Sequence, residues 1–407
     1  MEPDRHYRGV NKPDSHSGAN YKSVGIYVHV PFCEKKCFYC DFYSIENHSQ
    51  RKEFLSSLIS EIELLSQDQS QQFAADTIFF GGGTPSLLSA TEITSILDTL
   101  AGHFDLSHVV EITVECNPGT ITLESLTSYH NLGINRLSFG VQSFFDDELK
   151  FLSRIHDSQQ AIDAIHLARK CGFENINLDL MYGLPGQTME RVEANLRTAV
   201  HLEPDHISAY NLIVEPGTPL FSSVAAGAVK VLEEKTEATM YELTMALLEQ
   251  DGFEHYEISN YSRRGYNCRH NLKYWNSEEY LGFGPSAHSY LAGWRWWNVS
   301  SLGNYIAELS SGKLPISARE QLTENQVIDE FIMLQLRQGK IDLKKLDEGF
   351  QLTLDPDFIL DLVETGYAEA IGNRVFLTRK GFLVCDEIIE RVGRHLISPF
   401  ENARPQI

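Results

Sequence analysis

The sequence predicts an α/β protein in which a partial (β/α)6 TIM-like barrel precedes a winged-helix-like C-terminal α+β domain. Six short β-like runs, mostly followed by segments with apolar residues at helical spacing, predict the parallel sheet of the barrel. Short helices and a strand pair after about residue 320 predict the second domain. The six runs are VGIYVHV (24–30), DTIFF (76–80), EITVE (111–115), NRLSFGVQ (135–142), NINLDLM (175–181) and HISAYNL (206–212).

Polar residues occupy one face of four of these runs. In the third run Glu111, Thr113 and Glu115 share a face, because side chains alternate along a strand. A complete TIM barrel fills its interior with branched apolar side chains, so these polar faces predict a wide barrel that holds a polar ligand. An antiparallel sheet with one wet face is the alternative, and the long helical connections disfavour it. The other polar members are Tyr27, His29, Arg136, Ser138, Gln142, Asn175, Asn177 and Asp179.

The rest of the chain is expected to form three further parts around the barrel. A helix is predicted at about 233–250, stopped by Gly252, and the aromatic-rich stretch 253–300 is expected to be irregular. The acidic balance favours a packing or docking role for the winged-helix-like part. The predicted division is a flexible segment (1–23), the barrel (24–230), a connecting region with the HNLKYW motif (231–319) and the C-terminal domain (320–400).

Composition limits the classes of partner. A net charge of −22 lacks the basic footprint that holds a phosphate backbone, so nucleic acid is not expected to bind. No run of about 18 apolar residues predicts a membrane span. The first residues have neither the apolar core of a signal peptide nor the low acidity of a transit peptide. Seven cysteines, four of them scattered, do not make a disulfide framework, so we expect a cytoplasmic protein.

The stretch PFCEKKCFYCDFYS (31–44), here called the cysteine loop, places Cys33, Cys37 and Cys40 directly after the first run, on the rim where barrel active sites lie. A [4Fe–4S] cluster held by three thiolates leaves one iron free for the amino and carboxylate groups of S-adenosylmethionine. Two alternatives are a zinc site completed by His29 and three unrelated buried cysteines. Zinc ligands usually pair as C-x₂-C, which disfavours the first.

The stretch YVHVPFCEKKCFYC, with Tyr39 before the last cysteine, resembles the radical-SAM superfamily. Within it, the chain is most similar to the branch of oxygen-independent coproporphyrinogen III oxidases and HemW-type heme chaperones, and further motifs extend the resemblance over nearly the whole chain. The resemblance implies that Cys33, Cys37 and Cys40 hold the cluster. It also implies that S-adenosylmethionine is surrounded by Tyr27, Tyr39, Gly82, Gly83, Thr84, Glu115, Gln142, Arg154 and Asp179.

Four of these positions, Gly82, Gly83, Glu115 and Arg154, have a residue type that suits such a site. The glycines of GGGTPS (81–86) would let backbone amides approach the cofactor, although a tight turn also uses glycine. Glu115 could accept a hydrogen bond from an ammonium group, or be a solvated strand-end carboxylate. Arg154 offers a fork for a carboxylate, or is an ordinary surface arginine.

Departures from the oxidases favour the chaperones. The oxidases carry a fourth cysteine two residues after the third, where this chain has Phe42, and they have a longer segment before the first strand. The stretch HNLKYW (270–275) fits the HNxxYW signature of the chaperones. We therefore expect heme binding and delivery to acceptors such as respiratory enzymes. Oxidative decarboxylation of coproporphyrinogen III to protoporphyrinogen IX is the alternative, and dimerisation is left open.

His270 is the expected heme contact in that motif. A neutral imidazole is a good axial ligand, Tyr274 and Trp275 offer flat apolar surface, and Cys268 adds a soft ligand. His288 is a second histidine that could contact heme or simply belong to a loop. Alternatively, His270 and its neighbour hydrogen-bond irregular backbone while the aromatic rings fill core.

Overall fold

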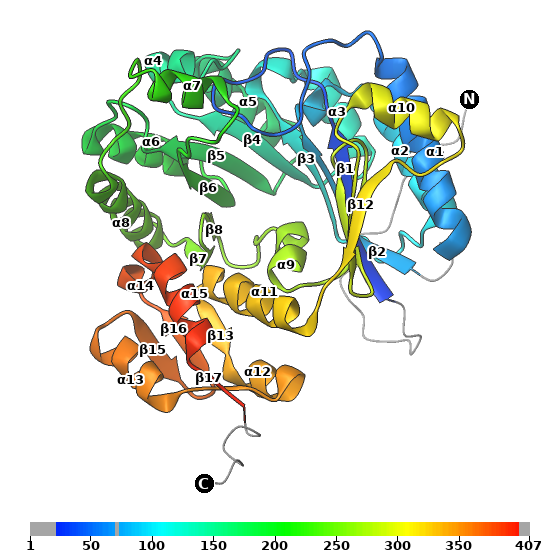
Figure 1. Cartoon of the computed structure of the whole chain (residues 1–407). Helices are drawn as coiled ribbons and strands as arrows, with labels where there is room; N and C mark the ends of the chain where they lie inside the picture. Colours follow the sequence, from blue (N-terminus) through cyan, green and yellow to red (C-terminus); the bar gives the residue numbers. More distant parts are fainter. Residues whose placement is uncertain (1–21, 70–72, 399–407) are drawn as a thin grey trace.

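The computed structural model describes residues 22–69 and 73–398, so nearly all of the predicted flexible segment lies outside the described residues. All six predicted runs form strands, paired in parallel and in sequence order. This confirms the α/β class and the six-stranded core of the barrel (Figure 1). The strands are β1 (Lys22–Val30), β2 (Phe73–Gly82), β3 (Glu111–Cys116), β4 (Arg136–Gln142), β5 (Ile176–Tyr182) and β6 (His206–Asn211).

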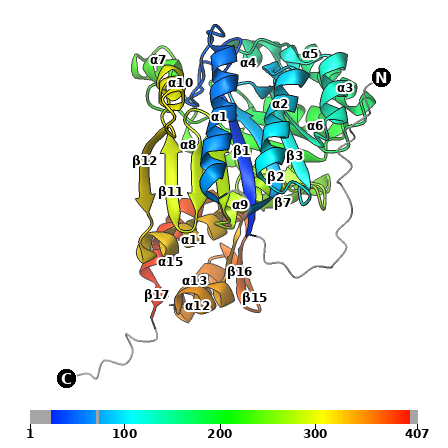
Figure 2. The same ribbon diagram turned by 90° about the vertical axis from the view of Figure 1, so that its right-hand side faces the viewer.

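Helices cover the outer, apolar face of these strands, as Figure 2 shows for the first three. Their buried residues recur at helical spacing, for example Ile93, Ile96 and Leu100. Capping boxes at Ser89 and Asp157 define where two of them begin, because each side chain satisfies a free backbone N–H. The covering helices are α1 (Arg51–Gln69), α2 (Ala90–His103), α3 (Leu123–Asn131), α4 (Asp146–Phe151), α5 (Ser158–Lys170) and α6 (Met189–His201).

The connecting region extends the sheet at both edges. The expectation of an irregular 253–300 was wrong, because short aromatic-rich strands carry the sheet to twelve strands in the order β12-β11-β10-β9-β1-β2-β3-β4-β5-β6-β8-β7. The added strands join the six core strands at two places. Strand β9 pairs with β1 at one edge, and β8 pairs with β6 at the other. The added elements are α7 (Pro219–Ala225), α8 (Glu234–Gln250), β7 (Glu254–Glu257), β8 (Asn260–Ser262), α9 (Arg269–Trp275), β9 (Tyr280–Phe283), β10 (His288–Leu291), β11 (Trp294–Asn298), α10 (Leu302–Ser310) and β12 (Ile316–Gln321).

The C-terminal part has the expected helices and a three-stranded antiparallel sheet in the order β13-β16-β15. It lies below the barrel in Figure 1, at the end of the strands opposite the cysteine loop. Backbone N–H of Ile258 donates to the carbonyl of Arg337, which joins it to the barrel edge. Its elements are α11 (Glu324–Arg337), β13 (Lys340–Asp342), α12 (Leu343–Phe350), β14 (Thr353–Leu354), α13 (Pro356–Glu364), β15 (Ala368–Ile371), β16 (Arg374–Leu377), α14 (Arg379–Leu383), α15 (Cys385–Arg394) and β17 (Leu396–Ile397).

None of the helices in the described ranges is long and apolar enough to cross a membrane.

Candidate functional site

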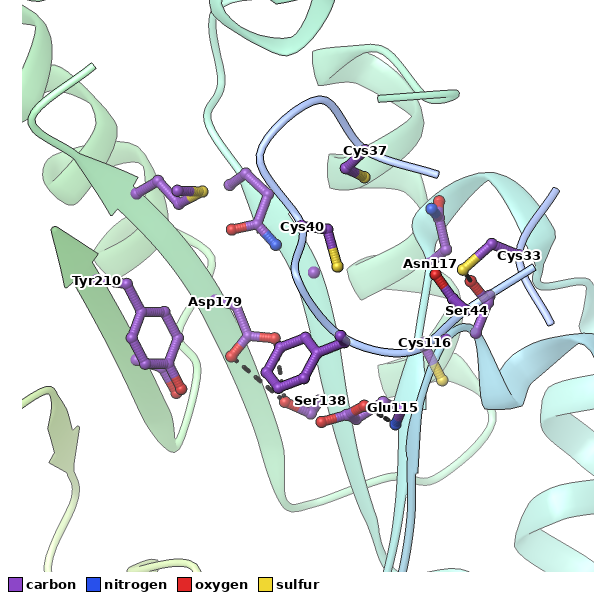
Figure 3. Close-up of a pocket in the computed structure, with 18 of the residues that line it drawn as sticks. Cys33, Cys37, Cys40, Ser44, Glu115, Cys116, Asn117, Ser138, Asp179 and Tyr210 are labelled. Carbon is purple, nitrogen blue, oxygen red and sulfur yellow. Dashed lines mark hydrogen bonds between the residues drawn. The ribbon is translucent and has the colours of Figure 1, made fainter. Parts of the chain in front are cut away.

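A cavity of about 410 Å³ opens at the carboxyl ends of the barrel strands, beneath the cysteine loop (Figure 3). Its volume lies within the roughly 300–1,000 Å³ typical of small-molecule sites. Two residues expected at the cofactor site, Tyr27 and His270, do not line it. The predicted residues that do line it are Cys33, Cys37, Tyr39, Cys40, Gly82, Gly83, Thr84, Glu115, Gln142, Arg154 and Asp179.

The cysteine sulfurs meet hydrogen-bond donors from two other elements. The guanidinium of Arg154 donates to the sulfur of Cys37 at 3.3 Å, and the hydroxyl of Thr84 donates to the sulfur of Cys33 at 3.5 Å. Donors of this kind, and a cationic one above all, stabilise the thiolate form that metals bind. The surroundings of Cys33 and Cys37 therefore fit thiolate ligands.

The arrangement fits a cluster better than a single metal ion. In the described ranges no three His, Cys, Asp or Glu side chains converge on one ion position. His29 cannot complete a zinc site as it stands, because its Nε2 contacts the carbonyl of Tyr43 at 2.9 Å and its Nδ1 contacts the hydroxyl of Tyr27 at 3.1 Å. In a [4Fe–4S] cluster each thiolate binds a different iron, so the sulfurs need not converge.

Two buried carboxyl groups form one wall of the cavity. Burial and the nearby Asp179 raise the pKa of Glu115 to about 8, although the N–H of Gly82, which donates to it at 3.1 Å, acts in the opposite direction. Burial also raises the pKa of Asp179, which accepts hydrogen bonds from Asn177 at 2.7 Å and Ser138 at 3.3 Å. A cationic ligand placed here would lower both pKa values, so the wall suits the positive groups of S-adenosylmethionine.

Two buried arginines face the same cavity with unsatisfied donors. Arg154 donates from Nη2 to the carbonyl of Gly140 at 2.6 Å, but its Nε has no partner, and neither has the Nε of Arg136, which is 2% exposed. A buried N–H without an acceptor costs on the order of 1–3 kcal/mol. Both donors therefore point to a polar ligand or ordered water, and a carboxylate would satisfy the fork expected of Arg154.

Gln142 reaches the cavity through an irregular strand end. The pairing of β4 with β5 shifts register between Phe139 and Gln142, and Gln142 has φ of 69°. The left-handed region is costly for a residue with a side chain, and such strain concentrates at functional sites. Alternation along β4 predicts the inner face for Gln142, and its side chain lines the cavity despite the irregular pairing.

The glycines at the end of β2 allow close backbone packing, and their N–H groups are already hydrogen-bonded within the protein. A Cβ on Gly83 would lie 2.7 Å from the carbonyl oxygen of Phe32 and 2.9 Å from that of Val30. Gly82 has φ of 109°, which favours glycine. The amide of Gly83 already donates to Val30 at 2.8 Å and that of Gly82 to Glu115. These two amides are therefore already bonded within the protein, and the expected contact of Gly82 and Gly83 with the cofactor stays a prediction.

His270 lies under the cavity floor, not at its surface. It is 1% exposed, its Nδ1 contacts the hydroxyl of Thr77 at 2.9 Å, and its Nε2 contacts that of Tyr274 at 2.8 Å. Burial lowers the pKa of His270 to about 3. The ring stacks on Phe79 with centroids 5.2 Å apart, and on Tyr27 at 6.5 Å. A direct contact with heme stays a prediction, and it would require one of these hydrogen bonds to break.

The HNLKYW motif forms α9, which is fastened to the inner faces of β2 and β3. Glu111 accepts hydrogen bonds from the N–H groups of Arg269 at 2.9 Å and His270 at 3.0 Å. Lys273 forms an ion pair with Asp76 at 2.7 Å. Cys268 is buried and donates from Sγ toward Glu111, so the structure does not present it as a soft ligand.

Sequence reasoning missed part of the cavity wall. Alternation on β6 from Ser208 would have placed Tyr210 on the same inner face. Asn271 lines the cavity although its neighbour His270 does not, which the motif alone could not reveal. The lining residues that sequence reasoning did not indicate are Lys35, Met181, Tyr210, Ile213 and Asn271.

The fold and the three-cysteine cavity define a radical-SAM-type protein, a class that holds a [4Fe–4S] cluster and S-adenosylmethionine. The family model of the Radical SAM superfamily matches residues 27–199, and that of the HemN C-terminal domain matches residues 322–384. Proteins named heme chaperone HemW are similar over most of their length, and the chain belongs to this HemW family.

The similarity to these relatives spans both parts of the chain. The HemW of Bacillus subtilis is 38% identical, covering 89% of this chain and 97% of the relative. That of Lactococcus lactis is 34% identical, covering 91% and 97%, and that of Mycobacterium tuberculosis is 35% identical, covering 90% and 93%. The solved structure of coproporphyrinogen III oxidase (HemN) from Escherichia coli has a TM-score of 0.76 at 24% identity, covering 91% of this chain and 90% of that one. At that identity the likeness shows the fold.

Proposed function

We propose that the protein binds heme and delivers it to acceptor proteins, while its barrel holds a [4Fe–4S] cluster and S-adenosylmethionine. The observation that carries this is the similarity to heme chaperones of 34–38% identity over nearly their whole length. Phe42, in place of the fourth cysteine of the oxidases, supports the same function. Within this proposal the acceptors are respiratory enzymes and the protein works in the cytoplasm.

The residues that line the cavity support a set of cofactor positions within this proposal. Cys33, Cys37 and Cys40 hold the cluster, and Arg154 meets the carboxylate of S-adenosylmethionine, supported by its unpartnered Nε. Glu115 faces the positive end of the cofactor. When bound, the cluster supplies an electron that can cleave S-adenosylmethionine to a radical. The other surrounding residues are Tyr39, Gly82, Gly83, Thr84, Gln142 and Asp179, with Tyr27 behind them.

The proposed division of labour follows the predicted parts of the chain. The barrel (24–230) carries the cofactors, the connecting region (231–319) completes the sheet and supplies α9, and the C-terminal domain (320–400) docks the acceptor. The distance of that domain from the cysteine loop supports separate surfaces for cofactor and acceptor (Figure 1).

One pair of assays tests the function. Anaerobically reconstituted full chain, titrated with hemin, should bind it stoichiometrically, and coproporphyrinogen III incubated with the same protein should remain unchanged. Decarboxylated product would overturn the proposal in favour of the oxidase reaction, and failure to bind hemin would also overturn it.

A second experiment tests the cofactor site. Reconstitution should give one four-iron cluster whose EPR signal changes with S-adenosylmethionine. The Cys37→Ser variant should lose the cluster, and the matched Cys171→Ser variant, at the end of α5, should keep it. Zinc in place of iron would contradict the assignment.

A further inference from the structure

Three large apolar side chains remain exposed at the mouth of the cofactor cavity. Phe42 is 65% exposed, Ile213 is 64% exposed and Tyr210 is 40% exposed, and all three line the cavity. Phe42 belongs to the cysteine loop, whereas Tyr210 and Ile213 lie at and just after the end of β6. Figure 3 places Tyr210 across the cavity from Cys33. We call these three side chains the apolar rim.

A separate apolar cluster borders the cavity that the rim lines, since Met181 and Tyr39 belong to both. It brings together the end of α4, the end of β5 and α7, with Phe38 and Tyr39 of the cysteine loop against it. The N–H of Leu220 donates to the carbonyl of Phe38 at 3.0 Å, which ties α7 to the cysteine loop. The two walls that carry the rim are therefore joined by packing. The buried members of the cluster are Leu152, Met181, Leu184, Leu212 and Leu220.

The mouth and the interior of the cavity differ in chemistry. The interior carries the ionisable side chains of Glu115, Arg136 and Asp179, which an apolar disc would leave without polar partners. The rim offers apolar surface that is otherwise in contact with water, and covering it is favourable. A polar cofactor therefore suits the interior, and a flat apolar ligand suits the rim.

The mouth carries side chains of both charges, although the chain has a net charge of −22. Lys35 lines the opening, and the ammonium of Lys36 donates to the carbonyl of Phe42 at 3.1 Å. Asp41 and Glu215 also line the opening. The two lysines of the cysteine loop are the cations available there to carboxylates on the edge of a flat ligand.

We propose that heme lies across the mouth of the barrel, with its face on the apolar rim and its propionates toward Lys35. The proposal rests on the heme-chaperone function and assigns the heme position within it. In this position heme contacts Phe42, the side chain that the cysteine loop contributes to the rim. It also removes the need for His270 to leave its two hydrogen-bond partners.

Heme in this position covers the route out of the cofactor cavity. S-adenosylmethionine bound below it leaves more slowly when heme is present. Any change in equilibrium affinity is reciprocal, so S-adenosylmethionine then alters heme affinity by the same factor.

The test uses the anaerobically reconstituted, cluster-loaded full chain, titrated with hemin and followed by its absorption band. The double variant Phe42→Ser with Ile213→Ser should bind hemin at least about tenfold more weakly, because burying such side chains fully is worth roughly that factor or more each. The matched control is Leu360→Ser with Ile371→Ser, whose side chains are 53% and 62% exposed on the C-terminal domain. It should bind hemin like the wild type. Circular dichroism checks that both double variants are folded.

A kinetic measurement separates the rim from other apolar surfaces. In the wild type, release of labelled S-adenosylmethionine should slow when hemin is bound, and the slowing should be lost in the rim variant. Unchanged hemin affinity in the double variant Phe42→Ser with Ile213→Ser would overturn the inference. Loss of hemin binding in His270→Ala, while that double variant binds hemin normally, would overturn it as well. Absence of hemin binding in the wild type would instead overturn the chaperone function itself.

Discussion

The guanidinium of Arg154 donates a hydrogen bond to the sulfur of Cys37, with Nη1 and Sγ 3.3 Å apart. The same side chain holds the carbonyl of Gly140 through Nη2. One arginine thus links the cysteine loop to the irregular end of β4, and its Nε stays buried without a partner. This geometry supports the roles proposed for Arg154, which are to position the cluster and to contact a ligand carboxylate.

Replacing Arg154 by Lys should weaken S-adenosylmethionine binding by about tenfold or more, because an ammonium cannot reproduce the planar fork and a hydrogen bond between charged groups is worth roughly 1.5–3 kcal/mol. The EPR signal of the reduced cluster should also shift, since a donor to Cys37 is altered. Calorimetric titration and EPR of the reconstituted protein measure the two effects. The exposed Arg197→Lys on α6, which loses only a surface pair with Glu193, should change neither. Equal affinities in the two variants would contradict the role of Arg154.

The strained backbone of Gln142 lowers the free energy of unfolding, and its side chain lines the cofactor cavity. Gln142→Gly should raise the free energy of unfolding by about 0.5–1 kcal/mol, because glycine adopts φ of 69° without strain. It should also weaken S-adenosylmethionine binding, since the side chain that lines the cavity is gone. Gln142→Ala is the matched variant, which should bind the cofactor as weakly without the gain in stability. Urea unfolding and calorimetric titration separate the two outcomes, and a destabilised glycine variant would be the contrary result.

The polar interior could be predicted from the sequence because the signal is local. Alternation in EITVE and NINLDLM placed Glu115 and Asp179 on inner faces, and the structure brings both to one wall of the cavity. The alternation of side chains along a strand can be recognised without knowing which elements the strand faces in the folded protein.

What could not be predicted depends on residues far apart in the chain. One of the two hydrogen-bond partners of His270 is Thr77, 193 residues away, and nothing in HNLKYW indicates that this hydroxyl bonds to the imidazole. The strands of the connecting region have three to six residues and lack a long alternating pattern, so their pairing depends on the barrel edge already being present.

Glu61 of α1 predicts how stability changes with pH. Its carboxyl accepts hydrogen bonds from the N–H of Gly284 at 2.8 Å, from Asn298 at 2.6 Å and from the hydroxyl of Tyr305 at 2.5 Å. Burial outweighs these donors and raises the pKa of Glu61 to about 7. A carboxyl whose pKa is higher in the folded state stabilises the protein fully below its unfolded pKa, and that contribution is lost as pH rises through 7.

Glu61→Gln should therefore remove part of the pH dependence, because the amide stays neutral. Relative to the variant, the wild type should lose about 3 kcal/mol of unfolding free energy between pH 4.5 and pH 8. Urea unfolding of both proteins across this range measures the difference. Parallel curves would mean that Glu61 is already ionised at low pH in the folded protein.

Glu111 predicts that α9 depends on the third strand. The helix has seven residues and no side-chain cap of its own at Cys268, so its first N–H groups rely on Glu111, which is 3% exposed. Glu111→Ala should lower the free energy of unfolding by about 3 kcal/mol, because it leaves those donors and the nearby Arg136 without a buried anion. Amide exchange over 268–275 should accelerate more than exchange in α3. The exposed Glu124→Ala in the first turn of α3 should change stability by no more than about 0.5 kcal/mol. If exchange in α9 were unchanged in Glu111→Ala, another contact, such as the pair of Lys273 with Asp76, would have to hold the helix in place.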